Sequence, residues 1–172
     1  MSAETAVDLS LLVMRLGLGI VFIAHGYNHI FGGGKVAGTA RWFESLGMRP
    51  GIMHAWTASL TELGAGVLLI LGFATPLACA GIVGTMLVAL MTNHLKNGFF
   101  IFRPGEGYEY VLTLTLVALG LAGLGAGRWS VDHGLGWWQP GGWWGLGIAV
   151  IAGGGGAAGL LVTFWSPART SE

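Results

Sequence analysis

Ionisable side chains stand within long apolar stretches of this sequence. His25 lies near the end of the apolar run at residues 9–31, and Glu62 lies near the middle of a later run. Such groups are costly in hydrocarbon and usually face a packed interior or a watery cavity. An imidazole titrates near neutral pH, and a carboxyl group can donate or accept a proton beside it. Glu62 and His25 therefore suggest acid–base chemistry inside an apolar protein.

The depth of these two residues favours pairing them. His25 lies roughly 9 Å inside its run, and Glu62 lies at a similar depth in the next run, since a helix rises about 1.5 Å per residue. A pocket between them could hold a small redox ligand such as a quinone, which takes up protons on reduction. Other residues could wall the pocket or position its ligand, and the candidates are Arg15, Trp42, Trp56, Asn97, Tyr108 and Glu109.

Two further interpretations of the histidines stay open. His25 and His29 are four residues apart and share a helical face, and His94 belongs to the same half of the membrane. Neutral imidazoles bind several transition metals, so these three residues could hold a metal or a haem. Alternatively, the same side chains only hydrogen-bond between helices and face the lipid headgroups.

Composition places the chain among membrane proteins. The 172 residues are 53% hydrophobic and only 9% charged, whereas soluble domains average about 25% charged residues. Zero net charge gives no indication of a nucleic-acid partner. The single cysteine, Cys79, cannot form an internal disulfide. The acidic N-terminus lacks the basic region of a signal peptide, so the first run is expected to be retained.

The apolar runs predict an all-α, polytopic membrane protein: a four-helix bundle with an additional C-terminal transmembrane helix. The four-helix unit covers residues 1–126 and includes an interfacial helix at about 35–46. A loop rich in Gly and Trp follows at 127–142, and a polar tail occupies 166–172. The predicted spans are residues 9–31, 52–71, 77–95, 108–125 and 143–165.

The fifth span is unusually rich in small residues. Small side chains at helical spacing let another helix approach closely. The span therefore predicts a docking surface for another membrane subunit or for a second copy of the chain. The alternative is a lipid-facing helix of low complexity. The candidate docking residues are Gly153, Gly155, Ala157 and Gly159.

Charge bias predicts the orientation. With five spans, most Lys and Arg residues gather on the face that follows the first span, so that face is expected to be cytoplasmic and the N-terminus outside. The predicted location is the cytoplasmic (inner) membrane. Arg15 is expected to snorkel to its own surface or to pair with Asp8, with an inward-facing charge as the alternative. Asp132 and His133 are expected in a solvated turn.

Several segments, in order, resemble the DoxX family of small bacterial membrane proteins. They are MRLGLGIVFIAHGYNHIFG (14–32), TELGAGVLLILGFATPLA (61–78), NGF (97–99), GYEY (107–110) and GAGRWSVD (125–132). The resemblance implies a four-helix membrane bundle associated with oxidoreductases. A related subunit belongs to a thiosulfate:quinone oxidoreductase, and other members are linked to oxidative-stress complexes. The matching positions are Arg15, His25, Gly26, Glu62, Asn97 and Gly98.

Two features depart from this resemblance. The family often has Lys where this chain has His29, and the fifth span goes beyond the usual four-helix unit. The leading hypothesis is a membrane subunit of a quinone-linked redox complex, with its pocket between the first, second and fourth spans. A non-catalytic scaffold that docks through the fifth helix is the alternative, and a metal or haem protein is the third hypothesis.

Overall fold

Helices make up most of the computed structural model, which describes residues 1–136 and 141–167. Within these residues, the long helices are α1 (Ala3–Phe31), α3 (Gly51–Leu71), α4 (Thr75–Ala89) and α5 (Glu109–Leu124). A fifth rod consists of α7 (Gly142–Ile148), the π-helical turn η3 (Ala149–Gly154) and α8 (Gly155–Phe164). Shorter elements are α2 (Lys35–Ser45), η1 (Leu90–His94), η2 (Leu95–Asn97) and α6 (Val131–Gly134).

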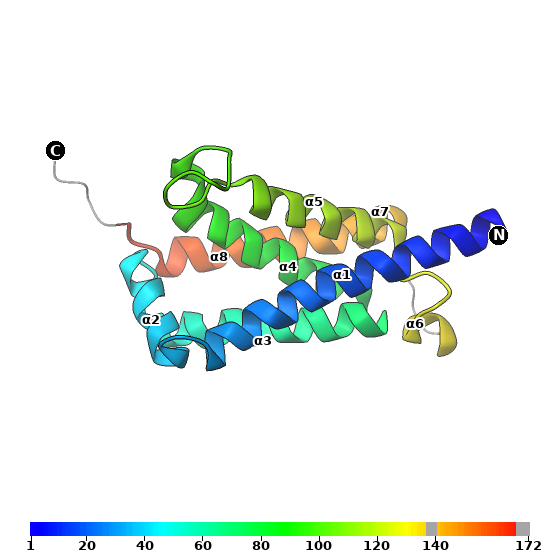
Figure 1. Cartoon of the computed structure of the whole chain (residues 1–172), viewed down its shortest axis with the longest axis horizontal. Helices are drawn as coiled ribbons and strands as arrows, with labels where there is room; N and C mark the ends of the chain where they lie inside the picture. The colour runs from blue at the N-terminus through cyan, green and yellow to red at the C-terminus, as the bar shows by residue number, and fades with distance from the viewer. Residues whose placement is uncertain (137–140, 168–172) are drawn as a thin grey trace.

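The long helices run side by side along one axis (Figure 1). Helix α2 lies across one end of this bundle, and α6 lies at the opposite end with the N-terminus. These are called the α2 end and the α6 end below. Helix α1 runs from the α6 end to the α2 end, and α3 returns beside it. Helix α8 finishes at the α2 end.

The chain is a multi-pass membrane protein, as its composition predicts. Among the described residues, four helical segments are long and apolar enough to cross a bilayer: Ala3–Phe31, Gly51–Leu71, Thr75–Asn97 and Gly142–Phe164. Helix α5 is apolar but has only 16 residues, about 24 Å of helix against roughly 30 Å of hydrocarbon. The predicted all-helical architecture with an extra C-terminal helix is confirmed. Residues 137–140 of the predicted loop and 168–172 of the predicted tail lie outside the described residues.

Small residues bring α1 and α3 close together. A Cβ atom at Gly19 would lie 2.8 Å from the carbonyl oxygen of Gly66, and a Cβ at Gly26 would lie 2.8 Å from that of Ser59. Larger side chains at these positions would force the two backbones apart. Because the helices are antiparallel, this contact sets the C-terminal part of α1 against the N-terminal part of α3, where the candidate site lies.

The fifth rod uses its small residues within the chain. Gly153 is so close to α4 that an added Cβ would lie 2.6 Å from the carbonyl oxygen of Ala80, and Ala157 is 3% exposed. Buried small residues recur at every fourth position of the rod: Gly145, Ala149, Gly153 and Ala157. The expectation that Gly153 and Ala157 await a partner is therefore wrong, because α4 covers them. Gly155 and Gly159 are exposed and have open space beside them.

Candidate functional site

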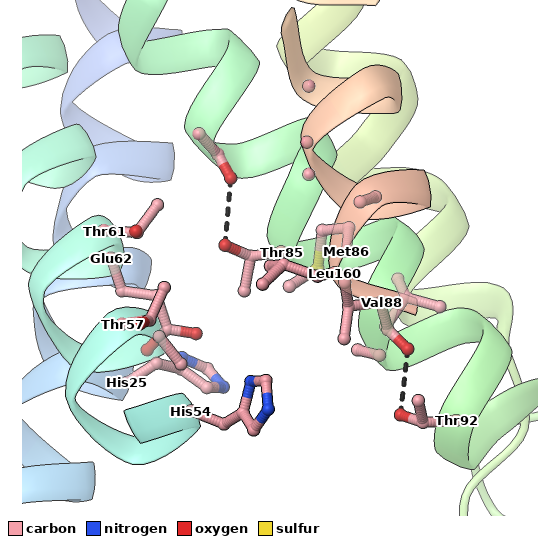
Figure 2. A pocket seen from close by; sticks show the side chains of 18 of the residues that line it. His25, His54, Thr57, Thr61, Glu62, Thr85, Met86, Val88, Thr92 and Leu160 are labelled. Carbon is pink, nitrogen blue, oxygen red and sulfur yellow. Dashed lines mark hydrogen bonds between the residues drawn. The ribbon is translucent and has the colours of Figure 1, made fainter. Parts of the chain in front are cut away.

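A cavity of about 560 Å³ lies in the half of the bundle nearer the α2 end. Side chains from α1, α3, α4, α5 and α8 line it, and most of its surface is apolar. The polar groups gather largely on the α1 and α3 side (Figure 2). The cavity is thus a space inside the bundle with an acid and several imidazoles in its wall.

Glu62 is the buried acid of this wall. Its residue surface is 3% exposed, and its Oε2 lies 3.2 Å from Nδ1 of His29. The two atoms are not aligned as a hydrogen bond, and neither has a hydrogen-bond partner among the described residues. A carboxyl group and an imidazole therefore meet in the wall with polar atoms still unused.

His25 lies in the same wall, but it is not the ion-pair partner of Glu62 that the sequence suggested. Its Nδ1 donates to the carbonyl oxygen of Val21 at 2.9 Å, and its ring stacks on Tyr110 with centroids 6.2 Å apart. Figure 2 shows the side chains of His25 and Glu62 on the same side of the cavity. Both line it, so both remain candidate groups.

The choice of His29 over His25 follows from helix geometry. Helical side chains lean toward the N-terminus of their own helix. Glu62 on α3 therefore leans toward the α2 end, whereas His29 on α1 leans back toward the middle of the bundle, and the two converge. His25 leans past Glu62 toward the preceding turn, where Val21 receives its hydrogen bond.

His54 is a third imidazole of the cavity, buried rather than facing headgroups. It is 3% exposed, and its ring lies between Phe43 at 6.0 Å and Phe164 at 5.4 Å. Its Nε2 has no hydrogen-bond partner among the described residues.

Sequence reasoning missed Tyr110 and the threonines of the wall: Thr57, Thr61 and Thr85. Thr61 and Tyr110 lie within one helical turn of the predicted residues Glu62 and Tyr108, but this spacing becomes a signal only once the facing helices are known.

Five predicted ligand-binding residues do not line the cavity, whereas Trp42 does. Asn97 donates from Nδ2 to the carbonyl oxygens of Gly105 at 2.6 Å and Glu106 at 3.1 Å. Glu109 accepts the amide hydrogen of Ile101 at 3.0 Å. Both residues thus hold the folded connection between η2 and α5. The expectation of a ligand contact in the cavity is therefore wrong for five residues: Arg15, Trp56, Asn97, Tyr108 and Glu109.

Trp56 and Tyr108 also have other surroundings. Trp56 is on the outer side of α3, 43% exposed, where an indole suits the membrane interface. Tyr108 packs edge-on against Phe99, with ring centroids 5.4 Å apart. Neither ring supplies a flat wall of the cavity.

Arg15 lies at the opposite end of the bundle and points inward. It is 0% exposed, and it donates from Nη1 to the carbonyl oxygen of Leu69 at 3.3 Å and from Nη2 to that of Trp129 at 2.5 Å. The buried Asp132 attracts it electrostatically and accepts the amide hydrogen of Ala74 at 3.1 Å. The expectations of a snorkelling Arg15 and a solvated Asp132 are wrong.

Asp8 pairs with Arg128 rather than with Arg15. Its Oδ2 accepts from Nε of Arg128 at 2.5 Å, and its Oδ1 accepts the Arg128 amide hydrogen at 2.9 Å. The hydrogen bond from its guanidinium to Asp8 raises the pKa of Arg128 above its usual value. His133, as expected, is exposed.

The geometry does not favour the metal hypothesis. Within the described ranges, no group of three His, Cys, Asp or Glu side chains is placed to hold a metal ion. Nδ1 of His94 donates to the carbonyl oxygen of Glu106 at 2.9 Å, as Nδ1 of His25 does to Val21. The three imidazoles proposed as ligands therefore do not converge on one point.

Comparison with known proteins identifies the family. Residues 10–95, half of the chain, match the DoxX family. The chain belongs to the DoxX family. A curated relative from Bacillus subtilis (strain 168), named "Putative oxidoreductase CatD", is 32% identical over 116 residues, which make up 67% of this chain and 81% of the relative. No solved structure matches the chain.

The DoxX match covers only part of the cavity. The matched region extends from α1 to the end of η1 and includes Glu62, His25, His29 and His54. Tyr110 on α5 and the glycines of α8 lie beyond it. In this DoxX protein, the polar wall thus comes from the family region, and the opposite wall comes partly from the C-terminal rod.

Proposed function

We propose that this DoxX protein binds a quinone in the cavity and serves as a membrane subunit of an oxidoreductase. The observation that carries the proposal is the buried Glu62 carboxyl group, 3.2 Å from the His29 imidazole in the wall of an otherwise mostly apolar space. The name of the Bacillus subtilis relative supports a link to redox chemistry.

The size and lining of the cavity suit such a ligand. Pockets for small molecules and cofactors usually measure about 300–1,000 Å³ and combine apolar walls with a few polar groups. The cavity, at about 560 Å³, falls within this range. Phe22 and Phe43 supply flat apolar surface, and Tyr110 and His25 supply rings with a polar edge.

The polar wall supplies protons. A quinone becomes a quinol by taking up two electrons and two protons, one proton on each carbonyl oxygen. Glu62 and the imidazoles of His25 and His29 are the groups that donate these protons, because all three line the cavity and carry exchangeable hydrogens. The electrons come from a partner redox protein, so the chain acts within a complex.

The charge bias gives the proposed orientation. The exposed residues Lys35, Arg41, Arg49, Lys96 and Arg103 lie at the α2 end of the described structure. We place this end in the cytoplasm and the N-terminus outside the inner membrane. Protons for the cavity would then be drawn from the cytoplasmic side.

Glu62→Gln tests the proposal in protein reconstituted into lipid nanodiscs. The wild type should quench its tryptophan fluorescence when titrated with a short-tailed benzoquinone, and membranes containing it should support quinone reduction. Loss of the acid should slow quinone reduction by about 100-fold or more, the range of a lost proton donor. The control is Glu4→Gln, because the Glu4 side chain is 80% exposed and lies at the α6 end, away from the cavity. No binding by the wild type, or unchanged reduction in Glu62→Gln, would contradict the proposal.

A scaffold role is the second candidate, and the exposed Gly155 and Gly159 favour it. Deleting residues 143–172 cannot separate the two roles, because the rod that would be removed is also a wall of the cavity. Gly159→Leu is a cleaner variant, since its added side chain meets open space. A scaffold would lose its partner during co-purification from membranes, whereas quinone binding would persist.

A further inference from the structure

The cavity has two unlike walls. Glu62 and His25 belong to the α3 and α1 side, whereas α4 and α8 present mostly small or apolar residues such as Gly81 and Gly156. A molecule that satisfies both walls needs a polar head and an apolar body. The question is how such a molecule reaches the space.

At the α2 end, the chain closes the side between α3 and α8. The amide hydrogen of Arg49 bonds to the carbonyl oxygen of Phe164 at 3.1 Å, and that of Ser166 bonds to Gly47 at 2.9 Å. The indole Nε1 of Trp165 donates to the Leu46 carbonyl oxygen at 2.9 Å. These three hydrogen bonds form a strap between the α2–α3 connection and the end of α8. Met48, between Gly47 and Arg49 in the same segment, is 0% exposed.

Below this strap, α3 and α8 separate. Helix α8 packs on α4, and α4 packs on α3, whereas the backbones of α3 and α8 hardly approach each other. The ring contact between His54 and Phe164 lies beside the strap, at the last residue of α8. Figure 2 shows the space between the two helices, with Thr57 and Glu62 on one side and Leu160 on the other. Because Thr57, Glu62 and Leu160 lie within segments long enough to span the membrane, this side of the cavity, the gap between α3 and α8, lies at the depth of the hydrocarbon.

The residues of α8 that border this gap form a row. Ala152, Gly156 and Leu160 line the cavity at four-residue spacing, beside the buried Gly153 and Ala157 that contact α4. Ala152 and Gly156 are exposed, and an added Cβ at Gly156 meets no atom within 4 Å. Gly156 thus keeps the mouth wide without packing against anything.

We propose that the cavity takes its ligand sideways from the bilayer, through the gap between α3 and α8, and that Gly156 holds this mouth open. The ligand class follows, resting on the proposed quinone function: a polar ring that carries an apolar, membrane-dissolved tail. The ring lies against Glu62 and the imidazoles, and the tail leaves through the gap into lipid. His94 and Glu106 line the cavity near the water. The alternative is entry from the water at these residues, and the tests must distinguish it from entry through the gap.

Photolabelling tests the route without any quinone. Protein in nanodiscs is irradiated with a membrane-dissolved aryl diazirine, and labelled residues are mapped by mass spectrometry. Ala80 and Gly84 of α4 line the cavity and are called its floor here. The floor should be labelled in the wild type, and Gly156→Leu should reduce this labelling at least fivefold. The control variant Gly155→Leu adds the same side chain to the neighbouring exposed glycine and should leave it unchanged. Leu116 is 58% exposed on the outer surface, so its labelling serves as the reference and should be equal in all samples.

Quinone binding tests the ligand class. Dissociation constants are expressed as quinone concentrations within the membrane, so that unequal partitioning into lipid does not affect the comparison. On this scale, a benzoquinone with two isoprenoid units should bind at least tenfold more tightly than the tail-less ring. Gly156→Leu should slow binding of the tailed compound at least tenfold, and Gly155→Leu should not.

The two measurements can fail separately. An unlabelled floor, or a floor labelled equally in wild type and Gly156→Leu, overturns the lateral route even if quinone binds. Equal affinity for the tailed and tail-less rings overturns the ligand class and points to the water-side route. A floor that is labelled in a protein that binds neither quinone overturns the proposed function and leaves the route standing.

Discussion

Two regions of the bundle each bury an ionisable side chain, and they treat it in opposite ways. At the α6 end, Arg15 donates two hydrogen bonds to main-chain carbonyl oxygens and faces Asp132. Near the middle of α3, Glu62 approaches His29 without a hydrogen bond and lines the cavity. The first group is held by the protein itself, whereas the second retains bonding capacity for something else.

This contrast separates a structural ionisable residue from a functional one. A buried ionisable residue in a membrane helix is by default a functional hypothesis, and both residues are functional candidates from the sequence alone. Only the surroundings distinguish them. Arg15 bonds to the end of α3 and to the segment before α6, whereas Glu62 makes its polar contact with His29 without a hydrogen bond. The following predictions test this division, beginning with the largest expected effect.

Arg15→Leu should destabilise the protein most. It removes both hydrogen bonds and the electrostatic attraction between the guanidinium and the buried Asp132, a loss of about 3–5 kcal/mol in unfolding free energy. Steric trapping in bicelles would measure this. Quinone affinity of the protein that remains folded should stay near the wild-type value. A stability equal to wild type would mean that Arg15 is not structural, and the contrast would collapse.

Gly72→Ala should have the next largest effect. Gly72 ends α3 with φ +65°, in the left-handed region that favours glycine, and an added Cβ would overlap Nη1 of Arg15. The cost should be about 1–3 kcal/mol by the same measurement. Gly64→Ala is the matched control, because Gly64 lies within α3 and its added Cβ meets nothing within 4 Å. Equal effects at the two glycines would argue against the Arg15 contact.

Trp165→Phe should loosen the strap at the α2 end. The change removes the Nε1 hydrogen bond to Leu46, with a loss of about 1 kcal/mol. Hydrogen exchange should therefore speed up about fivefold at the amides of Arg49 and Ser166, since exchange reports local opening. Amides in the middle of α4 should exchange as in the wild type, and a uniform change would show that the effect is not local.

Glu62→Gln should have the smallest effect on stability, within about 1 kcal/mol, because glutamine keeps the size and polarity of the side chain. This is the sharpest contrast with Arg15→Leu, since the same variant should abolish most quinone reduction. A large loss of stability in Glu62→Gln, measured by steric trapping, would make the acid a structural residue like Arg15.

Much of the architecture could be predicted from the sequence. The spans follow from apolar runs longer than about 18 residues, and their ends follow from Gly and Pro, as at Gly72 and Pro76. That Glu62 and His25 share one half of the membrane follows from counting helices. These inferences need only local patterns and the alternation of direction from one span to the next.

The remaining features depend on how helices rotate against one another. Whether Glu62 meets His25 or His29 turns on the lean of side chains along antiparallel helices, and the fate of Arg15 turns on the loop that brings Trp129 over it. The small residues of the fifth rod could not be assigned to an internal or external neighbour, because the pattern is the same for both. Hydropathy carries no information on these choices.

The π-helical turn η3 has a consequence for how such a binding space can change over time. In a regular helix, residues four apart drift by about 40° around the axis, so the buried series Gly145, Ala149, Gly153 and Ala157 would spiral away from α4. The π-helical turn has more residues per turn than an α-helix, so it reduces this drift and keeps the series facing α4. Losing or gaining one residue there would swing everything beyond it by about 100°, presenting new side chains to the ligand in a single step. Insertions and deletions, rather than substitutions, are thus the abrupt route to a different specificity.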